Sequence, residues 1–291
     1  MSDIDRREFL RRTLGSLGAV TLGSLAPEVR AETKQKFADD RIILGPSEVE
    51  VSRLAIGTGT SGFGGQSAQT RQLGISGLAD LLVTGYEHGI TFWDSADQYG
   101  SHPHLKEALE YVPREKVQIL TKTHATNERE MRADLDRFRK ELGTDYIDIL
   151  LLHMMTSGNW PEKMRGAMDV ISEAREKGIV RTHGVSCHTL PALKAAASSG
   201  WVQIDLARIN PAAVRMDSDV KTVSSVLGEM KQNGKGVIGM KILGDGRLTD
   251  NINKCLKFAL NHESVDCFTI GTESKEELFD LIERVPKVTG A

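Results

Sequence analysis

The sequence predicts an α/β protein folded as a (β/α)8 TIM barrel with an N-terminal β-hairpin. Eight short apolar segments, each followed by a segment of helical period or a loop, fill about 250 residues, the usual length of that barrel. The segments are almost continuously apolar, as strands covered on both faces are. A doubly wound open sheet is the alternative, because strands counted in one sequence do not show whether the sheet closes. No linker follows residue 40, so residues 32–291 should form one domain.

Residues 1–31 differ in composition from the rest of the chain. Arg6 and Arg7 precede a weakly apolar, glycine-broken run at 13–26, and a small-residue cleavage site follows at 29–31. This order resembles a twin-arginine export signal, and the run is too short for a stable membrane span. A chance arginine pair in an amphipathic N-terminus is the alternative. We expect the twin-arginine export machinery as a partner and a periplasmic or exported location, reached by the folded protein.

The elements of the barrel follow in order along the chain. Alternating apolar and polar residues around Gly45-Pro46-Ser47 predict the hairpin, which leads into a first strand ending near Gly57. The other seven strand candidates are TFWDSA, VQILTKT, IDILLLH, RTHGVSCH, QIDLARINP, GVIGMKIL and CFTIGT. Helical period is clear at 127–142 and 217–233, where apolar residues recur on one face.

The bulk composition argues against several classes of partner. The formal net charge is −3, the pI is near 6.3 and no basic run occurs, so a nucleic-acid-binding surface is not expected. The three cysteines form no CxxC pair, and His124, His183 and His188 lack a metal-ligand spacing. We therefore expect no metal site.

Ionisable side chains occur where consecutive strands end. Asp94 ends the second strand and Tyr99 follows in its loop, Lys122 lies in the third strand, and His153 ends the fourth. The C-terminal ends of the strands carry the active site in a TIM barrel, so these four residues should meet there. A lysine in an apolar strand is costly unless it is paired, and Asp94 is the natural partner. Each residue alone is more often structural, but four at one rim favour a catalytic set.

These four side chains suit proton transfer to a carbonyl group. A tyrosine has an unperturbed pKa of about 10 and gives up its proton more readily beside a cation. Lys122 can supply that cation while Asp94 holds it, and His153 can orient the carbonyl. With a hydride arriving on the other face, the set predicts an enzyme that reduces a carbonyl.

The same residues stand in motifs that resemble the aldo-keto reductase family. DSADQYG is similar to the family's D-x-A-x-x-Y-G, while ILTKT and YIDILLLH resemble the segments that carry its lysine and histidine. LGPSEVEVSRLAIGTG, GVSCH and FTIGTESKEEL resemble its hairpin and first strand, its G-V-S-N segment and its last strand. The resemblance covers about residues 41–285. It implies a reductase of small-molecule carbonyls that uses NADP(H) or NAD(H) without a GxGxxG fingerprint.

The resemblance also implies the residues that hold the cofactor, with its nicotinamide near Tyr99. A helix N-terminus after the last strand would accept a cofactor phosphate. The expected cofactor-binding residues are Gly57, Thr58, Asp94, Ser186, Cys187, Arg208, Met240, Lys241, Gly271, Thr272 and Lys275. The irregular GTSGFGG at 59–65 is expected to be a flexible rim, not a phosphate loop.

The chain departs from the family pattern at positions that concern the cofactor. Cys187 stands in place of an asparagine that bonds the carboxamide, Leu206 in place of a glutamine, and Met240 in place of a stacking aromatic residue. Three carboxylates crowd the last loop beside Lys275: Glu273, Glu276 and Glu277. Carboxylates there would repel a 2′-phosphate and suit a ribose hydroxyl, so the choice between NADP(H), the family default, and NAD(H) stays open.

Two further cations lie at the predicted rim and do not belong to the four proposed catalytic residues. Arg208 and Lys241 follow apolar runs on neighbouring strands, where they could bind a cofactor phosphate or an acidic substrate. Surface cations whose stems cover apolar residues are the alternative.

Two other functions fit the same residues. One is a nucleotide-binding sensor or accessory protein with little turnover, which the changes at Cys187 and Met240 keep open. The other is an enzyme with tightly bound cofactor that performs internal redox or elimination on a sugar, which export would favour.

Overall fold

The computed structural model describes residues 35–290, and the expected export signal at 1–31 lies outside them. An antiparallel hairpin comes first, formed by β1 (Arg41–Leu44) and β2 (Val49–Ser52) around the 3-10 turn η1 (Gly45–Ser47). No helix in the described part of the chain is long and apolar enough to cross a membrane.

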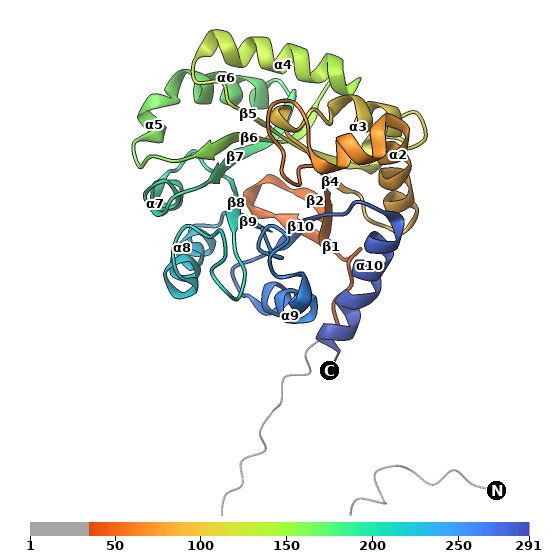
Figure 1. Ribbon diagram of the computed structural model, residues 1–291. Helices are drawn as coiled ribbons and strands as arrows, with labels where there is room; N and C mark the ends of the chain where they lie inside the picture. The colour runs from red at the N-terminus through yellow and green to blue at the C-terminus, as the bar shows by residue number, and fades with distance from the viewer. Residues whose placement is uncertain (1–34, 291) are drawn as a thin grey trace, which may run out of the picture. The chain divides into compact units, whose positions relative to one another are not determined.

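Eight parallel strands then close into a barrel (Figure 1). Each strand pairs with the next in the chain, and the last pairs with the first, which excludes an open sheet. The strands are β3 (Leu54–Gly57), β4 (Phe92–Asp94), β5 (Gln118–Thr123), β6 (Ile147–Met155), β7 (Val180–Cys187), β8 (Ile204–Arg208), β9 (Gly236–Met240) and β10 (Cys267–Gly271). The predicted barrel and hairpin are confirmed.

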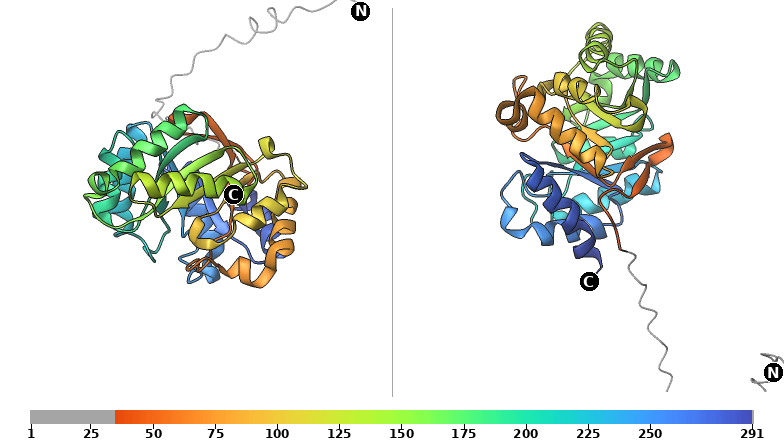
Figure 2. Two further views of the ribbon diagram at one scale, coloured as in Figure 1. Left: turned by 90° about the horizontal axis from the view of Figure 1, so that it is seen from above. Right: turned by 90° about the vertical axis from the view of Figure 1, so that its right-hand side faces the viewer.

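Helices form the outer layer around the strands, as Figures 1 and 2 show. They are α2 (Ala68–Glu87), α3 (His102–Ala108), α4 (Glu128–Leu142), α5 (Trp160–Lys163), α6 (Arg165–Glu176), α7 (Leu190–Ser198), α8 (Val220–Gln232), α9 (Ile252–Asn261) and α10 (Lys275–Thr289). Three 3-10 turns complete the chain: η2 (Asp97–Tyr99), η3 (Arg114–Lys116) and η4 (Thr249–Asn251).

Helix α4 shows why the sequence forms these elements. Its buried residues recur at the helical period and comprise Met131, Leu135, Phe138 and Leu142. The Asn127 side chain accepts a hydrogen bond from the Glu130 amide at the N-terminus, and Gly143 ends the helix with a φ of 67°. The helix predicted at 127–142 is therefore confirmed, and its polar face remains available to other elements.

The apolar core has two parts. The larger part lies between the strands and the surrounding helices, and the smaller part fills the barrel interior. The hairpin contributes Leu44, Val49 and Val51 to the interior, where they meet strand residues such as Phe92. Gly45 packs against the backbone of Gly236, the first residue of β9. The hairpin therefore closes the N-terminal end of the barrel and leaves the C-terminal end for a site.

Candidate active site

The four residues predicted to be catalytic lie at the C-terminal end of the barrel. Asp94 is the last residue of β4, Tyr99 ends the turn η2 that follows, and Lys122 and His153 lie late in β5 and β6. Gly100 after Tyr99 has a φ of 63°, and a Cβ there would lie 1.9 Å from the Gly65 carbonyl oxygen. Glycine is thus required for the turn that presents the tyrosine.

A buried ion pair anchors this group. Lys122 is 1% exposed, and its Nζ donates to Asp94 Oδ1 and, at 2.7 Å, to the Ser95 carbonyl oxygen. Thr269 Oγ1 donates to the other Asp94 oxygen at 2.9 Å. Burial alone would lower the pKa of Lys122, but Asp94 and Tyr99 outweigh burial and raise it. Lys122 is therefore a fixed cation.

Tyr99 lies between this cation and His153. The Lys122 Nζ is 4.7 Å from the centroid of the phenol ring, and the His153 ring meets it edge-on at 5.7 Å between centroids. Burial raises the pKa of Tyr99, and Lys122 opposes that rise. The phenol is therefore protonated at neutral pH, with a cation in place to stabilise the phenolate once the proton leaves.

His153 is held as a neutral imidazole. Burial, followed by the charges of Lys122 and two neighbouring histidines, places its pKa well below the ordinary value. Its Nδ1 has no hydrogen-bond partner among the described residues. The ring of His124 stacks on it at 4.7 Å, and His124 Nε2 lies 2.5 Å from Gln98 Oε1. A neutral imidazole here can donate a hydrogen bond to a substrate oxygen without competing as an acid.

Two glycines that sequence reasoning placed in a flexible rim pack directly on Tyr99. A Cβ on Gly59 would lie 2.2 Å from Tyr99 Cε2, and one on Gly62 would lie 2.3 Å from Cδ1. The glycines of GTSGFGG are therefore explained in part by the space that the phenol ring occupies. Their spacing in the sequence gives no hint of this contact.

A cleft of about 450 Å³ opens beside Tyr99 and Asp94. It includes five of the other residues expected to bind cofactor: Gly57, Met240, Lys241, Gly271 and Thr272. It also contains four carboxylates that belong to Asp245, Glu273, Glu277 and Asp280. Apart from Lys241, no lysine or arginine of the described chain lines it. The cleft is thus continuous with the phenol, and most of its charged side chains are acidic.

Five of the expected cofactor residues do not line this cleft, and three of them, Thr58, Ser186 and Cys187, have other contacts. Thr58 is buried and its hydroxyl bonds the Asp94 carbonyl oxygen at 2.9 Å. Ser186 Oγ accepts a hydrogen bond from the Met154 amide at 2.9 Å. Cys187 is buried in the core that faces the helices, and burial raises the pKa of its thiol well above the ordinary value.

The three cations expected near phosphate or substrate are all paired with carboxylates. Arg208 pairs with Asp217, whose side chain is fully buried. Lys241 pairs with Asp245 at 2.7 Å, and Lys275 with Asp80 at 2.6 Å. Arg208 and Lys275 lie outside the cleft lining. An anion-binding role for these residues stays a prediction, and it would require them to exchange partners.

Comparisons with known proteins agree with this geometry. A model of the aldo/keto reductase family matches residues 55–290. The NADH-specific methylglyoxal reductase of Escherichia coli (strain K12) is 25% identical over 169 residues, which cover 50% of this chain and 51% of that protein. A second methylglyoxal reductase of the same strain is 31% identical over 142 residues, covering 47% of this chain and 46% of that protein. The match thus spans about half the length of these curated relatives.

Solved structures share the fold over most of the chain. An aldo-keto reductase structure from Pseudomonas aeruginosa has a TM-score of 0.71 at 20% identity and covers 89% of this chain and 99% of that one. An aldo/keto reductase from Klebsiella pneumoniae, solved in complex with NADP and acetate, has a TM-score of 0.66 at 19% identity and covers 84% and 89%. Because the sequence identities are only 19–20%, these structures support the fold of this chain alone.

Proposed function

Because the chain belongs to the aldo/keto reductase family, we propose that it reduces an aldehyde or ketone to an alcohol with NAD(P)H. The observation that carries the proposal is the partly buried Tyr99, placed beside the Lys122–Asp94 pair and open to a cleft. Gly57 and Gly271 line the cleft beside Tyr99, where a nicotinamide end would lie. A Cβ on Gly57 would lie 2.9 Å from Thr269 Oγ1 and one on Gly271 would lie 2.3 Å from Thr60 Oγ1, so the packing of this wall requires both glycines. When bound, NAD(P)H supplies the hydride.

The proposed chemistry of the protein is a directed proton transfer. Tyr99 Oη donates its proton to the carbonyl oxygen while that oxygen gains negative charge. Lys122 stabilises the phenolate that remains, and Asp94 holds Lys122 in place. His153, kept neutral, donates a hydrogen bond that orients the same oxygen.

Turnover with a small carbonyl tests the proposal. Methylglyoxal is a suitable first probe because two matched relatives are named as methylglyoxal reductases. We expect loss of NADH or NADPH absorbance that requires both the protein and a carbonyl, within a panel of aldehydes, ketones and 2-oxo acids. Cofactor binding without turnover on the whole panel would instead favour a sensor or accessory protein.

We further propose that NADH is preferred over NADPH. The cleft carries Glu273 and Glu277, and the Glu277 carboxylate accepts the Glu273 amide at 2.7 Å, where an anion could otherwise bind. Lys241, the one cation that the described residues contribute to the lining, is paired with Asp245 at 2.7 Å. A 2′-phosphate would therefore meet carboxylates without an unpaired cation.

Fluorescence titration with both nucleotides tests this preference. We expect NADH to bind at least about tenfold more tightly than NADPH, since about 1.4 kcal/mol of repulsion gives that factor. The double substitution of Glu273 and Glu277 by Gln should bring the Kd for NADPH closer to the Kd for NADH. Glu283→Gln, at an exposed position outside the cleft, is the control. Tighter binding of NADPH by the wild-type protein would contradict the preference.

We also propose that the protein is exported in the folded state through the twin-arginine route. The support is the order of basic, weakly apolar and small residues in the first 31 positions. Replacing Arg6 and Arg7 by Lys should retain the protein in the cytoplasm, which cell fractionation measures. Unchanged export of the double variant would contradict the route.

A sugar substrate with tightly held cofactor is the second candidate. Free nicotinamide nucleotide is not expected outside the cytoplasm, so an exported enzyme would need to retain its own. Nucleotide released only when the purified protein is denatured would support this candidate. A nucleotide that exchanges freely in solution would remove it.

A further inference from the structure

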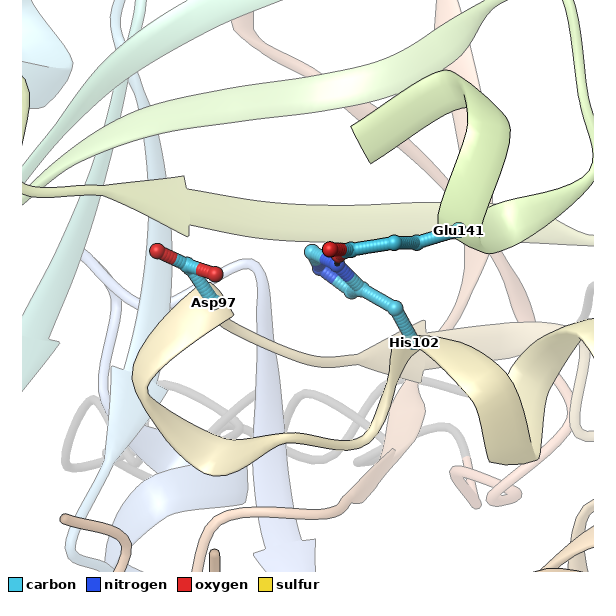
Figure 3. A group of neighbouring side chains, drawn as sticks. All are labelled: Asp97, His102 and Glu141. Carbon is cyan, nitrogen blue, oxygen red and sulfur yellow. Dashed lines mark hydrogen bonds and ion pairs between the residues drawn. The ribbon is translucent and has the colours of Figure 1, made fainter. Parts of the chain in front are cut away.

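Three side chains outside the cleft form a group that has the composition of a metal site. Asp97, His102 and Glu141 each bring one ligand-type atom within 4.8 Å of the others (Figure 3). Arg137 already occupies the space between the carboxylates, with Nη1 2.5 Å from Asp97 Oδ1 and 3.2 Å from Glu141 Oε1. Both His102 nitrogens are also engaged, Nδ1 by Glu141 at 2.8 Å and Nε2 by Thr121 Oγ1 at 2.7 Å. The group is therefore an ion-pair network around an arginine.

This network holds the turn that carries the catalytic phenol. The two terminal nitrogens of Arg137 donate to the two oxygens of Asp97, at 2.5 and 2.9 Å, so the pair is bidentate and fixes orientation as well as distance. Asp97 begins η2 and Tyr99 ends it. The Gly100 amide donates to the Asp97 carbonyl oxygen at 3.1 Å, which closes the turn around the tyrosine. A fixed Asp97 thus fixes the position of Tyr99.

The same network holds the strand that carries the catalytic lysine. Thr121 and Thr123 flank Lys122 in β5 and point to the opposite face of the strand, toward the outer helices α3 and α4. Thr121 bonds the imidazole of the network, and Thr123 Oγ1 donates to Asp134 Oδ2 at 2.5 Å. The other Asp134 oxygen accepts from Arg137 Nη2 at 2.7 Å. One face of α4 therefore contacts both the tyrosine turn and the lysine strand.

From these contacts we infer that Arg137 is a positioning residue, which sets the Tyr99 phenol against Lys122 for proton transfer. The inference rests on the proposed carbonyl reduction. Arg137 does not line the cleft, so it acts only through Asp97 and the α4 network. Hydrogen bonds from His102 and Arg137 lower the pKa of Glu141, which keeps the network charged at neutral pH. Small displacements of reacting groups cost large factors in rate, up to about 100-fold for 1 Å.

The test compares Arg137→Met with Arg132→Met on the same helix. Arg132 is similarly exposed and similarly paired, with Glu128 at 3.0 Å and Glu173 at 2.6 Å, but it contacts no element of the active site. For Arg137→Met we expect kcat to fall at least about tenfold while the KM for the carbonyl and the Kd for NADH stay within about twofold. Amide exchange at residues 95–101 should accelerate. Arg132→Met should change none of these quantities.

Each outcome decides the inference. Unchanged kcat and unchanged exchange in Arg137→Met would overturn it, and so would a KM and Kd that rise as much as kcat falls, since that pattern marks a general loss of structure. Should Arg137→Met fail to fold, Asp97→Asn keeps the side-chain volume, weakens only the bidentate pair, and must lower kcat in the same way. A wild-type protein without turnover contradicts the proposed reduction alone, and the exchange rates then still show whether Arg137 holds the turn.

Discussion

Lys122 contributes both to the stability of its strand and to the proposed chemistry of Tyr99. It is a buried cation inside an apolar strand, and its cost is offset by Asp94, the Ser95 carbonyl and the neighbouring phenol. The same contacts that make its burial tolerable place its charge beside Tyr99. Stability of the strand end and activation of the phenol therefore depend on one ion pair.

The contact between Gly59 and Tyr99 gives a prediction at the same scale. Gly59→Ala would bring a Cβ within 2.2 Å of the phenol ring, so the ring or the loop must shift. We expect kcat to fall by at least about tenfold, because the proton donor leaves its position relative to Lys122. Gly200→Ala, where no atom lies within 4 Å of the added Cβ, is the control. Equal kcat values for the two variants would show that the ring position does not govern turnover.

Asp205 gives a prediction about pH and stability. Its side chain is fully buried, and neither carboxylate oxygen has a hydrogen-bond partner among the described residues. Burial and then the nearby Asp217 raise its pKa to about 8. The unfolded chain releases this proton from about pH 4 upward, so the folded state loses stability as pH rises from about 4 to about 8.

Asp205→Asn removes that titration. At pH 4.5 we expect the variant and the wild type to unfold at nearly the same urea concentration. At pH 8.5 the free energy of unfolding of the variant should be higher than that of the wild type by at least about 1 kcal/mol. Asp250→Asn, at an exposed position, should show no such change with pH. A difference for Asp205→Asn that does not grow with pH would contradict the assignment.

At the element scale, the hairpin and the loops serve opposite ends of the barrel. The hairpin fills the N-terminal end with apolar side chains, while η2 and the segments after β9 and β10 build the cleft at the other end. Changes in the hairpin should therefore alter stability without altering the site.

Leu44→Ala tests this separation. Leu44 is fully buried in the barrel interior, so truncation should lower the free energy of unfolding by about 2–5 kcal/mol. The folded variant should keep the wild-type KM and kcat. Ile43→Ala, at a position that is 63% exposed, should cost no more than about 0.5 kcal/mol in urea unfolding. A changed KM in folded Leu44→Ala would show that the two ends are coupled.

The sequence predicts these elements well where the signal is local. The strands are largely apolar, and ionisable residues at or near the ends of β4, β5 and β6 mark the C-terminal rim, so the barrel and the meeting of Asp94, Tyr99, Lys122 and His153 follow from position alone. Contacts between distant segments have no such signal. The partner of Lys275 is Asp80, nearly the whole barrel away in the chain, and the contact of Gly59 with the phenol depends on how a loop folds back.

At the scale of the whole molecule, the closed barrel converts sequence order into a common site. Parallel pairing brings the ends of β4, β5 and β6 side by side, and β10 returns to β3 so that Thr269 reaches Asp94. On the outer side, α4 bonds the end of β5 through Asp134 and the turn after β4 through Arg137. The proposed reduction therefore depends on a proton donor whose position the entire barrel determines.

Whether Tyr99 is that proton donor is tested most directly by the turnover of Tyr99→Phe. The control variant is Tyr111→Phe, which removes the hydroxyl of a tyrosine that is 69% exposed. We expect Tyr99→Phe to lower kcat by about 10²–10⁴ while NADH binding stays within about twofold, because only the proton donor is lost. Tyr111→Phe should match the wild type. A Tyr99→Phe protein that reduces its carbonyl at the wild-type rate would contradict the mechanism and leave only the barrel and its cleft.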